Sequence, residues 1–266
     1  MAERLTKVER REIAREKARK LQLEQEKREK RNRMLMIGGA VLLVLLVALA
    51  VWAIVANASK SHLDGVDAPA GADEKGGISI GSSLAAGTVN EGAPVVDVYL
   101  DFTCHYCAIF EEINAEDLSA MAEEGLITLK MHPLTLLSTD ADGFTVQAAN
   151  AAATVAEYSP EHFLSFNNAL FTAFYEVYNR YIETQDTADY VLPSLAEIGE
   201  IASGVGVPQD VVDRFADATY NEWLTASTLQ FRADGFSGTP TVIVDGTQLT
   251  GEWQEAGAIR AMITGE

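Results

Sequence analysis

A long uncharged stretch near the N-terminus limits what this chain can fold into. Residues 34–56 are 23 consecutive positions without Asp, Glu, Lys or Arg. As a helix rising about 1.5 Å per residue, they would extend roughly 34 Å, enough to cross a hydrocarbon core of about 30 Å. Trp52 lies near the far end, where interfacial aromatic residues are common. We predict a transmembrane helix over 34–56.

The two sides of this stretch carry opposite charge. Residues 1–33 hold 13 of the 20 Lys and Arg but only 7 of the 39 Asp and Glu, whereas residues 57–266 hold 7 basic and 32 acidic residues. Because basic flanks stay on the cytoplasmic side, we expect a basic cytoplasmic segment over 1–33 and an extracytoplasmic remainder, crossing the cell membrane once. The negative charge of that remainder excludes nucleic acid as its partner.

The alternative is a cleaved signal peptide, because Ala56-Asn57-Ala58 resembles a small-x-small cleavage site. However, the basic region is longer than that of a usual signal, and the apolar run exceeds the usual roughly 7–15 residues. These features favour an uncleaved anchor.

Beyond the anchor, composition and periodicity predict a linker followed by one α/β domain. Residues 57–77 are rich in Ala, Gly, Ser and Asp, as in a flexible linker. Strand and helix patterns then follow. The expected strands are 78–80, 95–102, 127–131, 241–244 and 247–250, and the expected helices about 104–124 and 255–263.

About a hundred residues between the third and fourth expected strands contain no convincing strand. Helical stretches are expected near 144–158, 161–178, 190–203 and 208–235. A crossover between strands needs only a dozen or so residues. We therefore predict an inserted helical subdomain at about 134–236.

The chain has only two cysteines, Cys104 and Cys107, and they are separated by His105 and Tyr106. They follow an apolar strand directly and open the next helix. The free N–H groups and positive dipole of a helix N-terminus stabilise a thiolate and lower its pKa. We expect Cys104 to be the attacking and leaving sulfur and Cys107 the resolving one.

Two alternatives to redox chemistry are a structural disulfide and half of a zinc site. Closing so short a loop would contribute little stability, because loop-closure stabilisation grows with length. Structural zinc needs four ligands, and the other histidines, His62, His132 and His162, are scattered. We expect a redox-active Cys104–Cys107 disulfide, with no metal and no further cofactor.

The segment from Asp101 to Cys107 resembles the active-site block of the DsbA-like thiol–disulfide oxidoreductases. The segment 237–242, Ser-Gly-Thr-Pro-Thr-Val, is similar to that family's cis-proline loop, and the aromatic-rich stretch 160–171 and the helical insertion also match. The resemblance covers about 78–266. It implies an α/β, thioredoxin-like fold with an inserted α-helical subdomain, preceded here by one transmembrane helix, as in a membrane-anchored bacterial member.

The resemblance also implies roles at the site. Thr239-Pro240 should be cis and face the cysteines, so that the Thr239 backbone docks an extended substrate segment; a proline before a strand also fits an edge or a turn. His105 and Tyr106 should tune the cysteine pair, unless His105 merely faces solvent. The best-known member has Pro-His between its cysteines, so this pair differs.

Many relatives carry an acid six residues before the first cysteine, thought to relay protons to the buried sulfur. Val98 occupies that position here, with Asp97 and Asp101 nearby. Asp97 could replace the missing acid if its side chain turned inward, but a surface or capping role is favoured.

The resemblance points to an enzyme that donates disulfides to exported client proteins with free cysteines. A quinone-coupled membrane protein of the DsbB or vitamin K epoxide reductase type would reoxidise it. The same chemistry could serve an extracytoplasmic reductase or isomerase. A non-catalytic peptide-binding or chaperone module on a thioredoxin fold is the alternative from another class.

Overall fold

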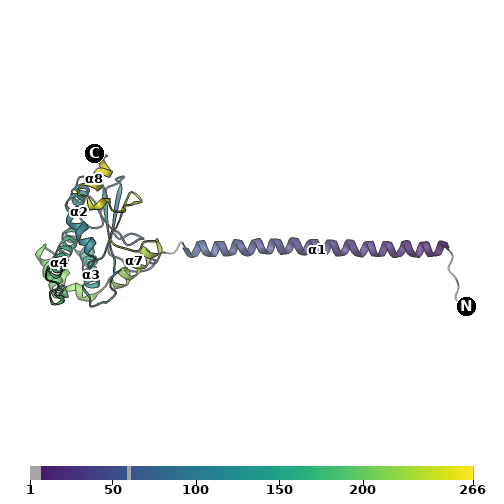
Figure 1. The fold of residues 1–266 in the computed structure, drawn as a ribbon, viewed down its shortest axis with the longest axis horizontal. Helices are drawn as coiled ribbons and strands as arrows, with labels where there is room; N and C mark the ends of the chain where they lie inside the picture. The colour runs from purple at the N-terminus through teal and green to yellow at the C-terminus, as the bar shows by residue number, and fades with distance from the viewer. Residues whose placement is uncertain (1–6, 59–60, 266) are drawn as a thin grey trace. The chain divides into compact units, whose positions relative to one another are not determined.

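The computed structural model describes residues 7–58 and 61–265, which belong to two units that divide between Lys60 and Ser61. The first unit is helix α1, Lys7–Ala58, which continues without a break from the basic segment into the apolar one (Figure 1). Its apolar side chains up to Trp52 are exposed. In the described part of the chain, α1 is the one helix long and apolar enough to be a candidate membrane span.

The second unit is built on a five-stranded sheet in the order β1-β3-β2-β4-β5. Strands β2 and β3 are parallel, and the other pairs are antiparallel. Helix α2, His105–Glu123, connects β2 to β3. The strands are β1 Ile78–Ile80, β2 Val95–Leu100, β3 Thr128–Pro133, β4 Thr241–Val244 and β5 Thr247–Gln248. The thioredoxin-like α/β fold expected from the sequence is therefore confirmed.

Both faces of the central strand β2 are covered, which explains why it is almost wholly apolar. Val96 and Val98 point to the main core, which they share with Phe110 of α2. Tyr99 points to the opposite face, where it packs with Phe231 of helix α7, Asn221–Ala233. The alternating side chains of β2 thus fix which residues can reach the cysteines, because Cys107 belongs to the main core.

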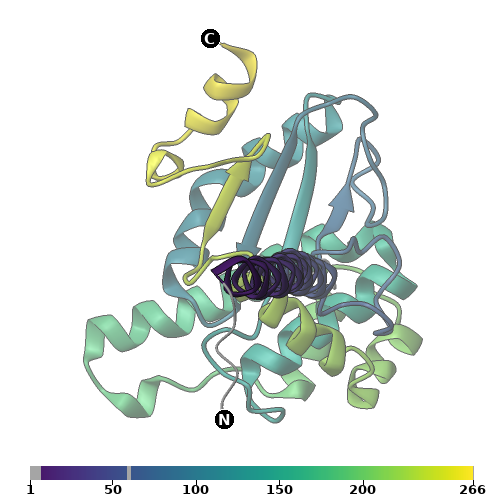
Figure 2. The same ribbon diagram turned by 90° about the vertical axis from the view of Figure 1, so that its right-hand side faces the viewer.

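The expected insertion is helical and gathers beyond one end of the strands (Figure 2). It contains α3 Phe144–Tyr158, α4 Phe163–Thr184, α5 Leu195–Gly204, α6 Gln209–Val212, a 3-10 helix Asp213–Asp217 and α7. The helix expected over 208–235 is instead α6, the 3-10 helix and α7, with a break between the last two. At this break the Asn150 side chain donates to the Phe215 carbonyl and accepts from the Tyr220 N–H.

The C-terminal helix α8 is Ala258–Thr264, shorter than the expected 255–263 at its start. A 3-10 turn, Glu252–Gln254, precedes it, and Gly257 has a φ of 80°. That left-handed conformation favours glycine and interrupts helical geometry before α8 begins.

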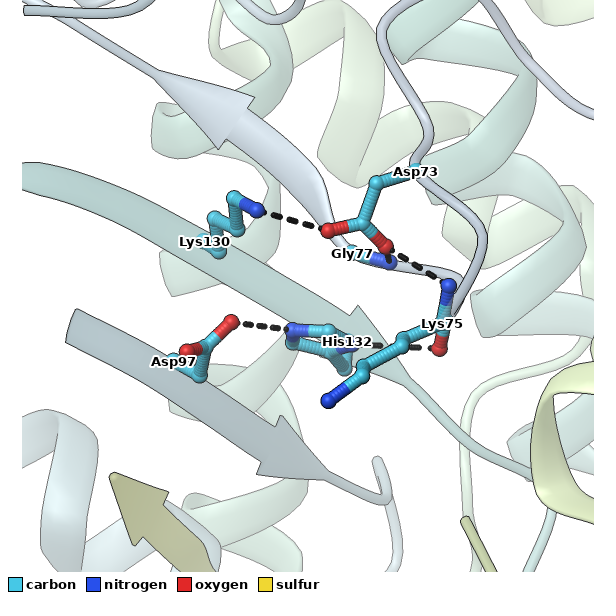
Figure 3. A network of polar contacts seen from close by, with 6 residues as sticks. All are labelled: Asp73, Lys75, Gly77, Asp97, Lys130 and His132. Atoms are coloured by element: carbon cyan, nitrogen blue, oxygen red, sulfur yellow. Dashed lines mark hydrogen bonds and ion pairs between the residues drawn. The ribbon is translucent and has the colours of Figure 1, made fainter. Parts of the chain in front are cut away.

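The sequence predicted a flexible linker over 57–77, but residues 61–77 pack against the domain. Asp73 forms an ion pair with Lys130 of β3 at 2.7 Å, and its other carboxylate oxygen accepts from the N–H groups of Lys75 and Gly77 (Figure 3). Ser61 hydrogen-bonds to Gln230 of α7. These partners lie 57 and 169 positions away, so local composition gives no sign of them.

Asp97 lies on the Tyr99 face of β2, where its side chain already has a hydrogen-bond partner. Its carboxylate is 2.9 Å from Nε2 of the fully buried His132 (Figure 3), whose ring stacks on Tyr99 at 3.8 Å between centroids. The cysteines lie on the other face. Asp97 therefore partners a buried histidine, which is neither the surface nor the capping role that the sequence favoured, and it does not face the sulfurs as a proton relay would.

Candidate active site

Asp101 forms the turn that carries the chain from β2 into α2. Its side chain is fully buried and accepts hydrogen bonds from the backbone N–H and hydroxyl of Thr103, both at 2.9 Å, and from the Leu137 N–H at 3.0 Å. Its carbonyl accepts from the Cys104 N–H at 2.9 Å. These bonds end the strand at Leu100 and set Cys104 at the start of the helix.

Cys104 is the N-cap of α2, and its sulfur accepts the Cys107 N–H at 3.4 Å. Both cysteines are free thiols. Cys104 is 6% exposed and lines a cavity, whereas Cys107 is completely buried. Only Cys104 is thus placed where a sulfur from another molecule can approach.

The two thiols differ sharply in acidity. Hydrogen bonding from the Cys107 side chain lowers the pKa of Cys104 to about 7, assisted by the Cys107 N–H, although burial and the Asp101 carboxylate act in the opposite direction. Burial raises the pKa of Cys107 well above its usual range. The lowered pKa gives Cys104 a thiolate population at neutral pH, the nucleophilic form, while Cys107 keeps its proton.

The Thr239-Pro240 peptide bond is cis and lies beside the cysteines, as the sequence predicted. The Cys104 thiol donates a hydrogen bond to the Thr239 carbonyl oxygen at 3.2 Å. The structure therefore brings together Cys104, Cys107, Thr239 and Pro240, which the sequence places in two distant segments.

The rings of His105 and Tyr106 lie 4.0 Å apart between centroids, but they differ in exposure. The His105 ring is half-buried and stacks on Tyr178 of α4, with 5.1 Å between centroids and 11° between planes. It does not simply face solvent. Tyr106 is 52% exposed and stands over the cleft beside the Thr239 loop.

Two cavities adjoin along that loop. One, of about 440 Å³, is lined by Cys104, Leu137 and Arg232. The other, of about 590 Å³, is lined by Leu249 and Trp253. Both share Tyr106 and the segment 236–239, so together they form one groove across the cis-proline loop.

Glu111 lies one helical turn after Cys107 and was not predicted from the sequence as a site residue. Its side chain is 7% exposed, and burial raises its pKa to about 8. With its amide turned so that nitrogen faces the carboxylate, Asn168 of α4 donates to Glu111 at 3.0 Å. Its helical position could have indicated burial, because Glu111 falls on the same helical face as Cys107 and the buried Leu118.

The arrangement has what thiol–disulfide exchange requires. A reachable sulfur of low pKa attacks or leaves, a buried sulfur resolves, and an open carbonyl edge beside them can align an extended chain. No group of three potential metal ligands occurs among the described residues.

Comparisons with known proteins agree with this geometry. Residues 81–263 match the family model described as "Thioredoxin". No curated protein matches the chain. Among solved structures, the thiol–disulfide oxidoreductase MdbA from Actinomyces oris is 26% identical, with a TM-score of 0.60 over 78% of this chain and 100% of its own. The reduced disulfide bond oxidoreductase DsbG from Mycobacterium tuberculosis is also 26% identical, with a TM-score of 0.56 over 73% of this chain and 88% of its own.

Proposed function

Because this chain belongs to the thioredoxin family and is a thiol–disulfide oxidoreductase of the DsbA-like type, we propose that it donates the Cys104–Cys107 disulfide to client proteins. The observation that carries the proposal is the contrast between a reachable thiol of lowered pKa and a buried one. A Cys104 pKa of about 7, below the roughly 8.5 of a free thiol, stabilises the reduced form relative to an untuned cysteine pair and so makes the disulfide more oxidising than in such a pair.

The reaction moves two electrons from the client to the enzyme. A client thiolate attacks the Cys104 sulfur, the Cys104–Cys107 bond breaks, and Cys107 leaves and takes up a proton. A second client thiolate then attacks the client sulfur of the mixed disulfide. Cys104 leaves as a thiolate, and the products are a client disulfide and the reduced enzyme.

The anchor gives this reaction a location. We propose that α1 crosses the cell membrane once, with the basic segment cytoplasmic and the catalytic domain outside, where disulfides form and persist. The clients would be exported proteins with free cysteines. A quinone-coupled membrane protein of the DsbB or vitamin K epoxide reductase type would reoxidise the Cys104–Cys107 pair.

The direction is tested by the redox equilibrium of the full-length chain, in a neutral detergent, against glutathione buffers. For a disulfide donor we expect a potential less negative than the roughly −270 mV of thioredoxin. A value near that of thioredoxin would favour the reductase alternative. Cys104→Ser is the control, because it removes the titrating disulfide.

Topology needs its own measurement. In right-side-out membrane vesicles, external protease should degrade the domain and leave an N-terminal fragment protected. A domain released in soluble form, with a new N-terminus near Ser59, would support the signal-peptide alternative instead.

A further inference from the structure

The groove across the cis-proline loop differs in charge from the rest of the domain. Residues 57–266 contain 32 acidic and 7 basic residues. None of the described residues that line the two adjoining cavities is an Asp or a Glu. An approaching client thiolate, which is an anion, therefore meets no lining carboxylate at the place where it must react.

Arg232 is the one Lys or Arg among the described residues that line this groove. It lies exposed in the last turn of α7, where the helix dipole favours a cation. In the part of the chain that the structure describes, no carboxylate pairs with Arg232, whereas Lys130 and Arg260 are both paired. The nearby Asp234 instead accepts a hydrogen bond from Gln230.

Arg232 lies where one flank of a bound client would pass. Arg232 and Cys104 line the same cavity, on the Leu137 side of the loop, while Trp253 lines the other cavity. A client whose cysteine reacts with Cys104 and whose backbone follows Thr239 extends in both directions from that point. Because an extended chain advances about 3.3 Å per residue, only the few residues next to the cysteine reach these cavities.

We propose that the groove selects client segments with an Asp or Glu within three residues of the reacting cysteine, on one flank only, and that Arg232 binds this carboxylate. The inference rests on the proposed function and names its preferred substrate class. An acidic side chain is repelled by the domain at large but finds an unpaired cation and no lining carboxylate here. Charge complementarity of this kind acts mainly on encounter and on choice between partners.

The test uses the oxidised full-length chain in neutral detergent at low salt. Single-cysteine peptides carry Asp, Asn or Lys at each position from three before to three after the cysteine. The rate of mixed-disulfide formation at Cys104 is divided by the rate of the same peptide with neutral hydroxyethyl disulfide, which removes the effect of the substitution on the peptide thiol. We expect Asp to exceed Asn by about two- to fivefold on one flank, with Lys slower than Asn.

Variants of the enzyme show whether the preference for acidic peptides depends on Arg232. Arg232→Gln should abolish the preference, Arg232→Lys should keep part of it, and 0.5 M salt should weaken it. Arg214→Gln is the matched control, because it removes the same charge from a residue that lies over the Tyr158 ring and lines neither cavity. Equal normalised rates for all peptides, or a preference that survives in Arg232→Gln, would overturn the inference alone. A Cys104–Cys107 disulfide with which no peptide thiol forms a mixed disulfide would overturn the proposed function itself.

Discussion

The His105 imidazole lies nearly parallel to the Tyr178 phenol, at 5.1 Å between ring centroids, although the two residues belong to the core helix α2 and the inserted helix α4. The insertion therefore holds the residue that directly follows the reactive Cys104. The stack fixes the orientation of the ring that the sequence predicts to tune the cysteine pair.

Removing this stack tests the predicted tuning of Cys104 by His105. If the imidazole tunes the thiol, Tyr178→Leu should raise the pKa of Cys104, because the ring then loses its Tyr178 partner. Tyr178→Phe keeps the ring and should leave that pKa unchanged. The pH dependence of Cys104 alkylation measures both variants, and an unaltered profile in Tyr178→Leu would show that the stack has no electrostatic role.

The reactivity of Cys104 should follow its own titration. With a pKa of about 7, the thiolate fraction grows as pH rises from 6 to 8, so iodoacetamide alkylation of the reduced chain should accelerate with a midpoint near 7. Cys107 should stay unlabelled over this range, because burial raises its pKa. Cys107→Ala should move the Cys104 midpoint upward, since the Cys107 side chain supplies the main hydrogen bond. Equal labelling of the two cysteines would contradict this assignment.

Glu111 should make the reduced domain less stable as pH rises. Its pKa is about 8 in the folded chain, whereas an unfolded glutamate ionises near 4.3. Between these values the unfolded state loses its proton and the folded state keeps it, so stability falls with rising pH. Glu111→Gln should therefore unfold like wild type at pH 4 and be more stable at pH 7, by about 2 kcal/mol. Urea unfolding at both pH values measures this, with the exposed Glu112→Gln as a control that should show no such difference.

Asp73 should make the domain less stable as the pH falls, the opposite of Glu111. Burial raises its pKa, but the Lys130 ammonium and the Gly77 and Lys75 N–H groups outweigh this and hold it below the usual value. Its stabilisation is thus present at neutral pH and lost as pH falls below about 4 towards the folded value. Asp73→Asn should cost about 1 kcal/mol in urea unfolding at pH 7 and less at pH 3. Glu74→Gln, an exposed neighbour, is the control; an equal loss at both pH values would contradict an ionic role.

The sequence predicted those parts of the site that have local signals. Cys104 and Cys107 share the first turn of one helix, and an apolar strand precedes them, so spacing alone indicated their chemistry. Thr239 and Pro240 were assigned because a short segment resembles a known loop. The succession of strands and helices along the chain followed from periodicity, and the helical insertion from the length without strands.

The rest depended on contacts between distant segments. Tyr178 reaches His105 only because α4 packs on α2, and nothing in the α4 sequence marks that residue among its other aromatics. Residues 61–77 have the composition of a linker, yet the Asp73–Lys130 pair and β1 hold their backbone to the sheet. The position of Arg232 beside Cys104 likewise results from tertiary packing alone.

The bond from the Cys104 thiol to the Thr239 carbonyl bears on turnover. In the reduced thiol form, that carbonyl oxygen already has a donor from within the protein. In the disulfide form Cys104 has no hydrogen to donate, so the same oxygen is open to a client's backbone N–H. Once the released Cys104 thiolate takes up a proton, its thiol therefore competes with the client backbone for the docking edge. The protonated reduced enzyme should then hold an oxidised client less tightly than the disulfide form holds a reduced one.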